Sequence, residues 1–125
     1  MIIGVGVDIC EVSRIENELK REDCGFRNDV FTAGEIAYCE SQRHPARSYA
    51  ARFAAKEAVL KALGERPESG FFLREIETLK SPTGSPRLEL SGRIKEIAAL
   101  SRVRRIQVSL SHTDRLALAF VILES

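Results

Sequence analysis

Apolar and polar residues alternate along several stretches of the chain, which is the pattern expected of strands that are buried on one face. Over residues 2–9 one face carries four branched apolar side chains: Ile3, Val5, Val7 and Ile9. The opposite face carries Gly4, Gly6 and Asp8. Because the two glycines remove side chains from that face, something can approach the strand backbone closely there.

The same alternation returns near the C-terminus. Residues 106–111 alternate apolar and polar side chains, and a second apolar strand is expected over residues 116–123. Since only a short polar turn separates the two strands, the pattern predicts a hairpin. Shorter alternations predict two further strands, over 71–80 and 87–90, on either side of a turn that is rich in serine and proline.

Two Ser/Thr-x-x-Glu segments predict helix N-termini, because such segments can form capping boxes. The first, Ser13–Glu16, predicts a helix that ends near Arg21, and the second, Thr32–Glu35, predicts a helix that ends near Gln42. A further helix is expected over 92–101, where apolar residues recur at helical spacing.

A longer helix is expected from Pro45, which suits a first turn, to Leu63, with Gly64 just past its end. Aromatic and leucine side chains gather on one side of this helix, and the other side is lined by alanines: Ala51, Ala55, Ala58 and Ala62. The order of elements is one strand, three helices, two strands, one helix and two strands. This order predicts an α+β fold with a largely antiparallel sheet and a long buried helix.

Length and composition bound the function. The 125 residues suit a single domain over 1–125, and a content of 44% hydrophobic and 30% charged residues is typical of a globular protein. A net charge of +1 predicts no nucleic-acid or membrane partner. No apolar run approaches the ~18 residues of a membrane span, and the N-terminus lacks the basic region of a signal peptide.

Cysteine and arginine positions add to this picture. The three cysteines, Cys10, Cys24 and Cys39, lack metal-site spacing and predict free thiols in a reducing compartment, so a cytoplasmic protein is expected. Arginines gather in two groups: Arg43, Arg47 and Arg52, and Arg102, Arg104 and Arg105. Such groups usually form solvated faces, but they can also meet phosphates or an acidic protein.

The long helix carries ionisable residues among its apolar ones. Glu57 and Lys61 are four residues apart and share a stripe between the two apolar sides of the helix. They could form a surface salt bridge, which contributes about 0.2–0.5 kcal/mol. Because burial of ionisable groups is costly, their presence on a helix that is packed on two sides also indicates a functional role, and the two interpretations carry about equal weight.

Asp8 is a second carboxylate on an otherwise apolar element. Alone, it could simply cap the turn that follows its strand. Together, Asp8 and Glu57 offer two hard oxygen ligands from different elements, which suit Mg²⁺, an ion that keeps several waters and shares its coordination with substrate phosphates. Lys61 would then neutralise phosphate charge.

His112 and Thr113 lie where a predicted strand ends at a turn. His112 could cap backbone groups of that turn, or both side chains could donate hydrogen bonds to a phosphate. No Ser/His/Asp order compels a hydrolase. The glycine motifs of P-loop and Rossmann proteins are absent from the sequence.

Four segments together resemble the holo-acyl-carrier-protein synthases, the small bacterial family of 4′-phosphopantetheinyl transferases. Gly6-Val7-Asp8 is similar to the family's G-x-D strand, and Phe53–Ala62 is similar to its F-x-x-K-E-A-x-x-K-A helix. Gly84–Pro86, followed by Leu90-Ser91-Gly92, resembles the G-x-P…L-x-G segment, and Ser109–Thr113 resembles the closing S-x-S-H-T hairpin. The segments occur in order and span nearly the whole chain.

The resemblance implies a reaction that depends on Mg²⁺, with coenzyme A as co-substrate. The 4′-phosphopantetheine group moves from coenzyme A to a serine of an apo-acyl-carrier protein, in fatty acid biosynthesis, and adenosine 3′,5′-bisphosphate is the other product. By the same resemblance, Asp8 and Glu57 hold the metal, and Lys61 stabilises the transferred phosphoryl or leaving group. Glu57 or a metal-bound water accepts the serine proton. The implied candidates for the coenzyme A phosphates are Arg47, Arg52, His112 and Thr113.

The resemblance also implies partners. Small family members are homotrimers with active sites at subunit interfaces, and the helix with Arg14, Lys20 and Arg21 corresponds to the region that meets an acidic carrier protein. One segment departs from the family. Where relatives commonly have a Gly-Thr-Gly type of loop close to coenzyme A, Gly64–Gly70 contains two glutamates, and Arg66 could take over a phosphate contact there.

Three alternatives stay open at this stage. The transferase could serve a polyketide-type carrier, the chain could be a non-catalytic subunit that binds coenzyme A or a nucleotide, or it could be a purely structural oligomer. The presence of Asp8, Glu57 and Lys61 argues against the last two, because an enzyme that has lost its activity usually loses such groups, and a purely structural role leaves ionisable residues on apolar elements unexplained.

Overall fold

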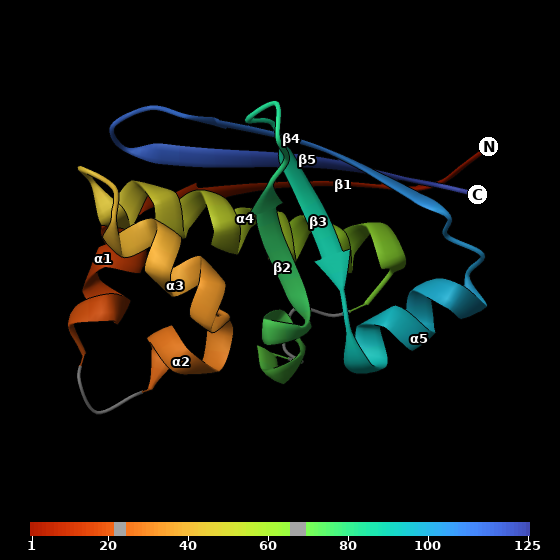
Figure 1. Ribbon diagram of the computed structural model, residues 1–125, viewed down its shortest axis with the longest axis horizontal. Coiled ribbons are helices and arrows are strands. Elements are labelled where there is room, and N and C mark those ends of the chain that lie inside the picture. The colour runs from red at the N-terminus through yellow and green to blue at the C-terminus, as the bar shows by residue number, and fades with distance from the viewer. Residues whose placement is uncertain (22–24, 66–69) are drawn as a thin grey trace.

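The computed structural model describes residues 1–21, 25–65 and 70–125, and its elements follow the predicted order with two additional helical segments (Figure 1). In chain order the elements are β1 (Ile2–Glu11), α1 (Val12–Lys20), α2 (Phe26–Val30), α3 (Ala33–Glu40), α4 (Pro45–Leu63), the 3₁₀ helix η1 (Gly70–Glu75), β2 (Ile76–Lys80), β3 (Pro86–Leu90), α5 (Gly92–Leu100), β4 (Arg105–His112) and β5 (Leu116–Glu124).

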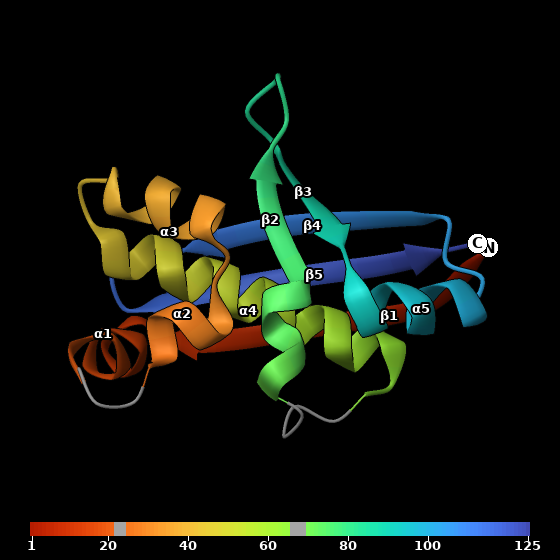
Figure 2. The same ribbon diagram turned by 60° about the horizontal axis from the view of Figure 1, so that its bottom comes forward.

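All strand pairs in the described part of the chain are antiparallel. They form a three-stranded sheet in the order β1-β5-β4 and a separate two-stranded sheet of β2 and β3. Helix α4 lies along one face of the larger sheet, and the β2–β3 hairpin crosses the same side of the molecule (Figures 1 and 2). The predicted α+β class and the buried long helix are confirmed.

The two glycines of β1 allow α4 to lie directly against the strand. A Cβ atom built on Gly4 would overlap the carbonyl oxygen of Ala62, and one built on Gly6 would overlap that of Ala58. The close neighbour that the glycine face predicted is therefore the backbone of α4 itself. This contact fixes how the strand that carries Asp8 is placed on the helix that carries Glu57.

The opposite side of α4 packs on aromatic side chains. The rings of Phe31 and Tyr49 are 4.8 Å apart, and those of Phe26 and Phe53 are 6.0 Å apart. Both sides of the helix are thus covered, as the two apolar stripes predicted. Gly64 ends α4 in the left-handed conformation with φ 77°, which a glycine adopts without strain.

A buried ion pair joins α4 to α3 and β2. The Lys56 amino group lies 2.7 Å from Glu35 Oε1 and also donates to the carbonyl oxygens of Leu73 and Ile76, while neither charged side chain is exposed to solvent. Glu35 belongs to the capping box predicted at Thr32, which is confirmed. Glu35 therefore serves both the start of α3 and the charge of Lys56.

Two predicted elements differ from the observed ones. Helix α1 begins at Val12, and its N-cap Glu11 makes no side-chain capping bond, so the capping box at Ser13 is wrong. The Val12 N–H donates instead to the carbonyl oxygen of Arg115, which anchors the first turn of α1 to the β4–β5 turn. The predicted strand over 71–80 begins only at Ile76, because η1 occupies its first half.

The sequence pattern missed α2, which has five residues and too few apolar positions for a period. Cys10 and Cys39 are free and buried, whereas Cys24 lies outside the described residues. In the described ranges no helix is long and apolar enough to cross a membrane.

The outer face of the three-stranded sheet is apolar and uncovered. Six side chains on this face are between 39% and 60% exposed: Ile3, Val5, Val7, Ile9, Leu116 and Phe120. Figure 1 shows the sheet nearly edge-on, with the helices of the described residues gathered on its other side. An uncovered patch of this kind is typical of a protein–protein interface.

Candidate active site

Asp8 and Lys61 meet at the junction of β1 and α4. The Lys61 amino group donates to Asp8 Oδ1 at 2.9 Å and to the carbonyl oxygen of Val7 at 3.2 Å. Asp8 is largely buried, and Lys61 is about half exposed. Among the described residues, Lys61 pairs with this distant aspartate and not with Glu57, so the interpretation of Glu57 and Lys61 as a local surface salt bridge is wrong.

Glu57 projects from α4 beside this pair and is half buried. Burial raises the pKa of the Glu57 carboxyl, and the nearby negative charge of Asp8 raises it further, while Lys61 and Arg14 act in the opposite direction. Glu57 has no hydrogen-bond or ion-pair partner in the described part of the chain. The result is a half-buried carboxylate beside a second carboxylate, an arrangement that a cation stabilises.

This donor set fits a hard divalent cation. Two carboxylates from different elements supply hard oxygen ligands and leave most of the coordination sphere to waters and ligand oxygens, as Mg²⁺ sites commonly do. Within the described ranges no three or more His, Cys, Asp or Glu side chains lie so that together they could hold a metal ion, so an all-protein cage is not built here. The residues present therefore suit a metal that is shared with a phosphate ligand.

Arg14 lies on α1 near the carboxylate cluster, which consists of Asp8, Glu57 and the paired Lys61. Its guanidinium lies 5.6 Å from the centre of the Phe53 ring on α4, and its charge lowers the pKa of the Glu57 carboxyl. The other two basic residues of this region make exposed ion pairs along the chain, Lys20 with Glu16 and Arg21 with Glu18. Arg14 is thus the basic residue of this region that the structure brings closest to the carboxylates.

A second group of predicted residues meets on the other side of α4. Arg47, Arg52 and His112 line one groove of about 290 Å³ between α3, α4 and β4. Arg52 is buried and its guanidinium lies 4.1 Å from the centre of the Tyr38 ring, whereas Arg47 lies 3.2 Å from Asp114 of the β4–β5 turn. Arg43 and His44 line the same groove, and basic side chains gathered in this way can bind phosphate groups.

Thr113 does not line this groove. Its hydroxyl accepts hydrogen bonds from the backbone N–H groups of Arg115 and Leu116, so it caps the β4–β5 turn. His112 makes no side-chain hydrogen bond with the described residues, which leaves both ring nitrogens open to a ligand. The capping role considered for His112 therefore belongs to its neighbour.

The two groups lie toward opposite edges of the three-stranded sheet. Asp8 pairs with Ala119 across β5, and Ala119 pairs with Leu110 on β4, so Asp8 and Leu110 share one row of the sheet. Two strand spacings separate the ends of that row, which is about 10 Å between backbones. Because α4 also lies between them, one chain does not bring the carboxylate cluster and the arginine groove together.

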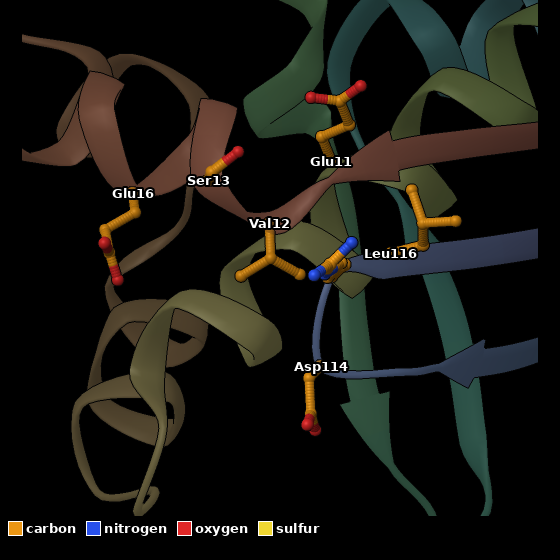
Figure 3. A pocket seen from close by; sticks show the side chains of 7 residues that line it. Glu11, Val12, Ser13, Glu16, Asp114 and Leu116 are labelled. Atoms are coloured by element: carbon orange, nitrogen blue, oxygen red, sulfur yellow. The ribbon is translucent and has the colours of Figure 1, made fainter.

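A further hollow of about 560 Å³ lies where α1 begins beside the β4–β5 turn (Figure 3). Glu11, Glu16 and Asp114 stand around it, and Figure 3 shows their side chains pointing in different directions. They do not converge on a common point, and none of the residues predicted for the site lines this hollow. We assign it no role in the chemistry.

The sequence reasoning missed Tyr38, whose ring contacts Arg52, and the buried pair of Lys56 and Glu35. Nothing in the local pattern marks Tyr38, whereas a lysine that follows two alanines of a buried helix was a usable signal for the ion pair. Residues 66–69 of the atypical loop, including Arg66, lie outside the described residues.

Comparison with known proteins defines the class. The family model of the 4′-phosphopantetheinyl transferase superfamily matches residues 4–121, and the chain belongs to this superfamily.

Particular relatives are similar over their full length. Curated proteins named holo-[acyl-carrier-protein] synthase include one from Methylobacterium radiotolerans, 42% identical over 100% of this chain and 95% of its own length. Another, from Syntrophus aciditrophicus, is 43% identical over 99% of this chain and 97% of its own length.

Solved structures agree with this relationship. The crystal structure of the synthase from Neisseria meningitidis matches with a TM-score of 0.87 and 30% identity over 100% of both chains. That of the Helicobacter pylori synthase, a complex with coenzyme A, matches with a TM-score of 0.79 and 32% identity over 96% of this chain and 99% of its own. The predicted family membership and fold are confirmed.

Proposed function

We propose that this protein, acting as one domain over residues 1–125, is a holo-acyl-carrier-protein synthase of fatty acid biosynthesis. It moves the 4′-phosphopantetheine group of coenzyme A to a serine of an apo-acyl-carrier protein and releases adenosine 3′,5′-bisphosphate. The observation that carries the proposal is the cluster of Asp8, Glu57 and Lys61, which β1 and α4 assemble from two distant segments. Full-length similarity to synthases, one of them solved with coenzyme A, supports the same reaction.

Asp8 and Glu57 are the residues that would hold Mg²⁺. When bound, the ion supplies positive charge to the phosphate oxygens of the coenzyme. The half-buried, unpartnered carboxylate of Glu57 supports this assignment, because a cation offsets both the burial and the repulsion from Asp8 that raise the pKa of this carboxyl. Cytoplasmic localisation and Mg²⁺ dependence are both parts of the proposal.

Lys61 and Glu57 can then act on the reacting atoms. In the reaction the serine oxygen forms a bond to the phosphorus of the phosphopantetheine group, and the phosphoanhydride bond to the nucleotide breaks. Lys61 stabilises negative charge on the transferred or departing phosphate. The serine proton would pass to the Glu57 carboxylate or to a water molecule held at the cluster.

The coenzyme phosphates are proposed to bind in the groove lined by Arg47, Arg52 and His112. Thr113 contributes by fixing the turn next to His112. Since the groove and the carboxylate cluster are separated within one chain, we propose that two copies complete each site, as expected of a homotrimer. The uncovered apolar sheet face supports this assembly, because a second copy can bury it.

The acyl-carrier protein is proposed to dock beside α1. Arg14 stands next to the carboxylate cluster, and Lys20 and Arg21 extend the basic character of this region. An acidic carrier surface would be attracted there, and its serine would arrive close to Glu57. A polyketide-type carrier with the same acidic surface is the second candidate substrate.

Intact-mass spectrometry of an apo-acyl-carrier protein tests the proposed function. After incubation with this protein, coenzyme A and Mg²⁺, the carrier is expected to gain the mass of one phosphopantetheine, and a chelator should prevent the gain. An unmodified carrier, found with several carriers while coenzyme A still binds, would instead indicate the non-catalytic alternative.

A further inference from the structure

The inner end of the arginine groove contains buried polar groups without partners. Arg52 is 6% exposed and Thr78 is 4% exposed. Among the described residues, neither Arg52 Nε nor Thr78 Oγ1 has a hydrogen-bond partner. Both atoms belong to residues that line a hollow beside the β2–β3 hairpin. This hollow shares Tyr38 and Arg52 with the arginine groove.

Arg52 carries a permanent positive charge in this buried position, because a guanidinium does not lose its proton in proteins. A buried charge is costly unless a partner compensates it. Arg52 makes no ion pair within the described part of the chain. The compensating group that the structure provides is the ring of Tyr38, whose centre lies 4.1 Å from the guanidinium carbon, a close cation–π contact.

Two other arginines near this region are held differently. Arg27 lies over the Tyr49 ring at 5.7 Å, and its Nε also lacks a hydrogen-bond partner among the described residues, but a carboxylate oxygen of Glu40 at 3.6 Å compensates its charge. Arg47 is held by Asp114 at 3.2 Å. A nearby carboxylate compensates the charge of an arginine. A ring fixes an arginine from the face and leaves the in-plane donors available.

We propose that Tyr38 is a positioning residue that holds Arg52 ready for a phosphate group of the coenzyme. The inference rests on the proposed function, since it takes the ligand to be coenzyme A. The ring is the acting part of Tyr38: in the described residues its hydroxyl makes no hydrogen bond, so phenylalanine can replace it. Tyr38 lies on α3, which the Glu35–Lys56 pair ties to α4, and this bond keeps the ring over Arg52.

The test compares Tyr38→Leu with Tyr38→Phe in the full chain. Binding of adenosine 3′,5′-bisphosphate is measured by isothermal titration calorimetry, and KM for coenzyme A and kcat are measured in the transfer reaction. Tyr38→Leu is expected to weaken binding and to raise KM about 10-fold, the size expected for a lost, partly desolvated cation–π contact, while kcat changes less than about twofold. Tyr38→Phe is expected to keep the wild-type affinity for adenosine 3′,5′-bisphosphate and the wild-type KM for coenzyme A.

A double-mutant cycle separates positioning from a general loss of structure. If Tyr38 acts through Arg52, Tyr38→Leu has no further effect on binding in an Arg52→Met background. Additive losses would overturn the inference, as would wild-type affinity in Tyr38→Leu or an equal loss in Tyr38→Phe. Thermal unfolding of each variant reports folding, and Tyr38→Met, which fills similar space without a ring face, replaces the leucine variant if that variant does not fold.

The calorimetric binding measurement also distinguishes a failure of the role of Tyr38 from a failure of the proposed function. Calorimetry needs no turnover, so the contrast between the leucine and phenylalanine variants stands on its own if the wild-type protein fails to modify a carrier. If wild-type protein transfers phosphopantetheine and Tyr38→Leu has an unchanged KM, the function stands and the role of Tyr38 is wrong.

Discussion

Replacing Gly6 with alanine should damage both the fold and the site, because Gly6 lies where β1 touches the backbone of α4. An added Cβ would overlap the carbonyl oxygen of Ala58 and would come within 2.9 Å of its carbonyl carbon and 3.0 Å of the Ala62 nitrogen. Normal carbon contacts are about 3.5–4.0 Å, so the strand and helix must separate by roughly 1 Å. All three atoms are backbone atoms, which no change of rotamer can move aside.

The expected loss of stability follows from this overlap. Overpacking of a core costs about 1–3 kcal/mol, and the upper end applies to a backbone obstacle. The reduced freedom of the unfolded chain in a glycine-to-alanine change returns about 0.4–1 kcal/mol. A net loss of about 2 kcal/mol, with an unfolding entropy of about 2.1 cal/mol/K per residue over 125 residues, corresponds to a fall in Tm of about 8 °C.

The same separation should reduce transfer, because Asp8 follows Gly6 closely on β1 and Glu57 precedes Ala58 on α4. A displacement of about 1 Å between catalytic groups commonly costs about 100-fold in rate. Thermal unfolding by circular dichroism and the rate of carrier modification, measured at a temperature where the variant is folded, give the two readouts.

Gly34→Ala is the matched control, since Gly34 lies inside α3 and an added Cβ meets chiefly the end of the Glu77 side chain, which can turn aside at the cost of its hydrogen bond from the Thr32 hydroxyl. This control should leave Tm nearly unchanged, because the helix preference of alanine offsets the weakened bond. If Gly6→Ala unfolds within about 2 °C of the wild-type protein and keeps its full rate, the argument that the glycine contact sets the site is refuted.

Three further changes test separate parts of the structure. Lys56→Met should lower the free energy of unfolding by about 3–5 kcal/mol, measured by urea denaturation, because it leaves the Glu35 carboxylate buried without its partner; an unchanged midpoint would contradict this. Arg14→Glu should raise KM for the acyl-carrier protein without weakening coenzyme A binding, and an unaltered KM would remove α1 from the docking surface. Burial raises the pKa of the Cys39 thiol to about 12, so at pH 8 this thiol should resist a disulfide reagent in folded protein whose other cysteines are serine, and rapid native labelling would contradict its burial.

Local patterns predicted those elements whose signals are local. The alternation of β1, the proline start and glycine end of α4, and the capping box at Thr32 each depend on residues close in sequence, and the structure contains all of them. The predicted capping box at Ser13 was wrong, because a hydrogen bond from the Val12 N–H to the distant β4–β5 turn sets the start of α1. The predicted start of β2 was wrong for a similar reason. The Lys56 amino group, distant in sequence, binds the carbonyl oxygens of Leu73 and Ile76 in the segment where the strand was expected to begin.

The candidate site was predictable in its members but not in its arrangement. Asp8, Glu57 and Lys61 could be selected because each is an ionisable residue on an apolar element. That Lys61 would pair with Asp8 and leave Glu57 unpartnered depends on how α4 rests on β1, which the sequence does not specify. Tyr38 could not be predicted at all, because its contacts come from cations of distant segments: Arg52 of α4, 4.1 Å from the centre of its ring, and Lys80 of β2, at 5.2 Å.

In the proposed function, the carboxylate cluster couples cleavage of coenzyme A to modification of a carrier serine. The decisive experiment measures both products of one reaction, the mass gained by the apo-acyl-carrier protein and the adenosine 3′,5′-bisphosphate released, for the wild-type protein and for Glu57→Gln. We expect equal amounts of the two products for the wild-type protein, and at least a 100-fold loss of both for Glu57→Gln, which keeps the shape of the side chain but not its charge. Wild-type rates in Glu57→Gln, or release of the bisphosphate without any change in the carrier, would contradict this proposal.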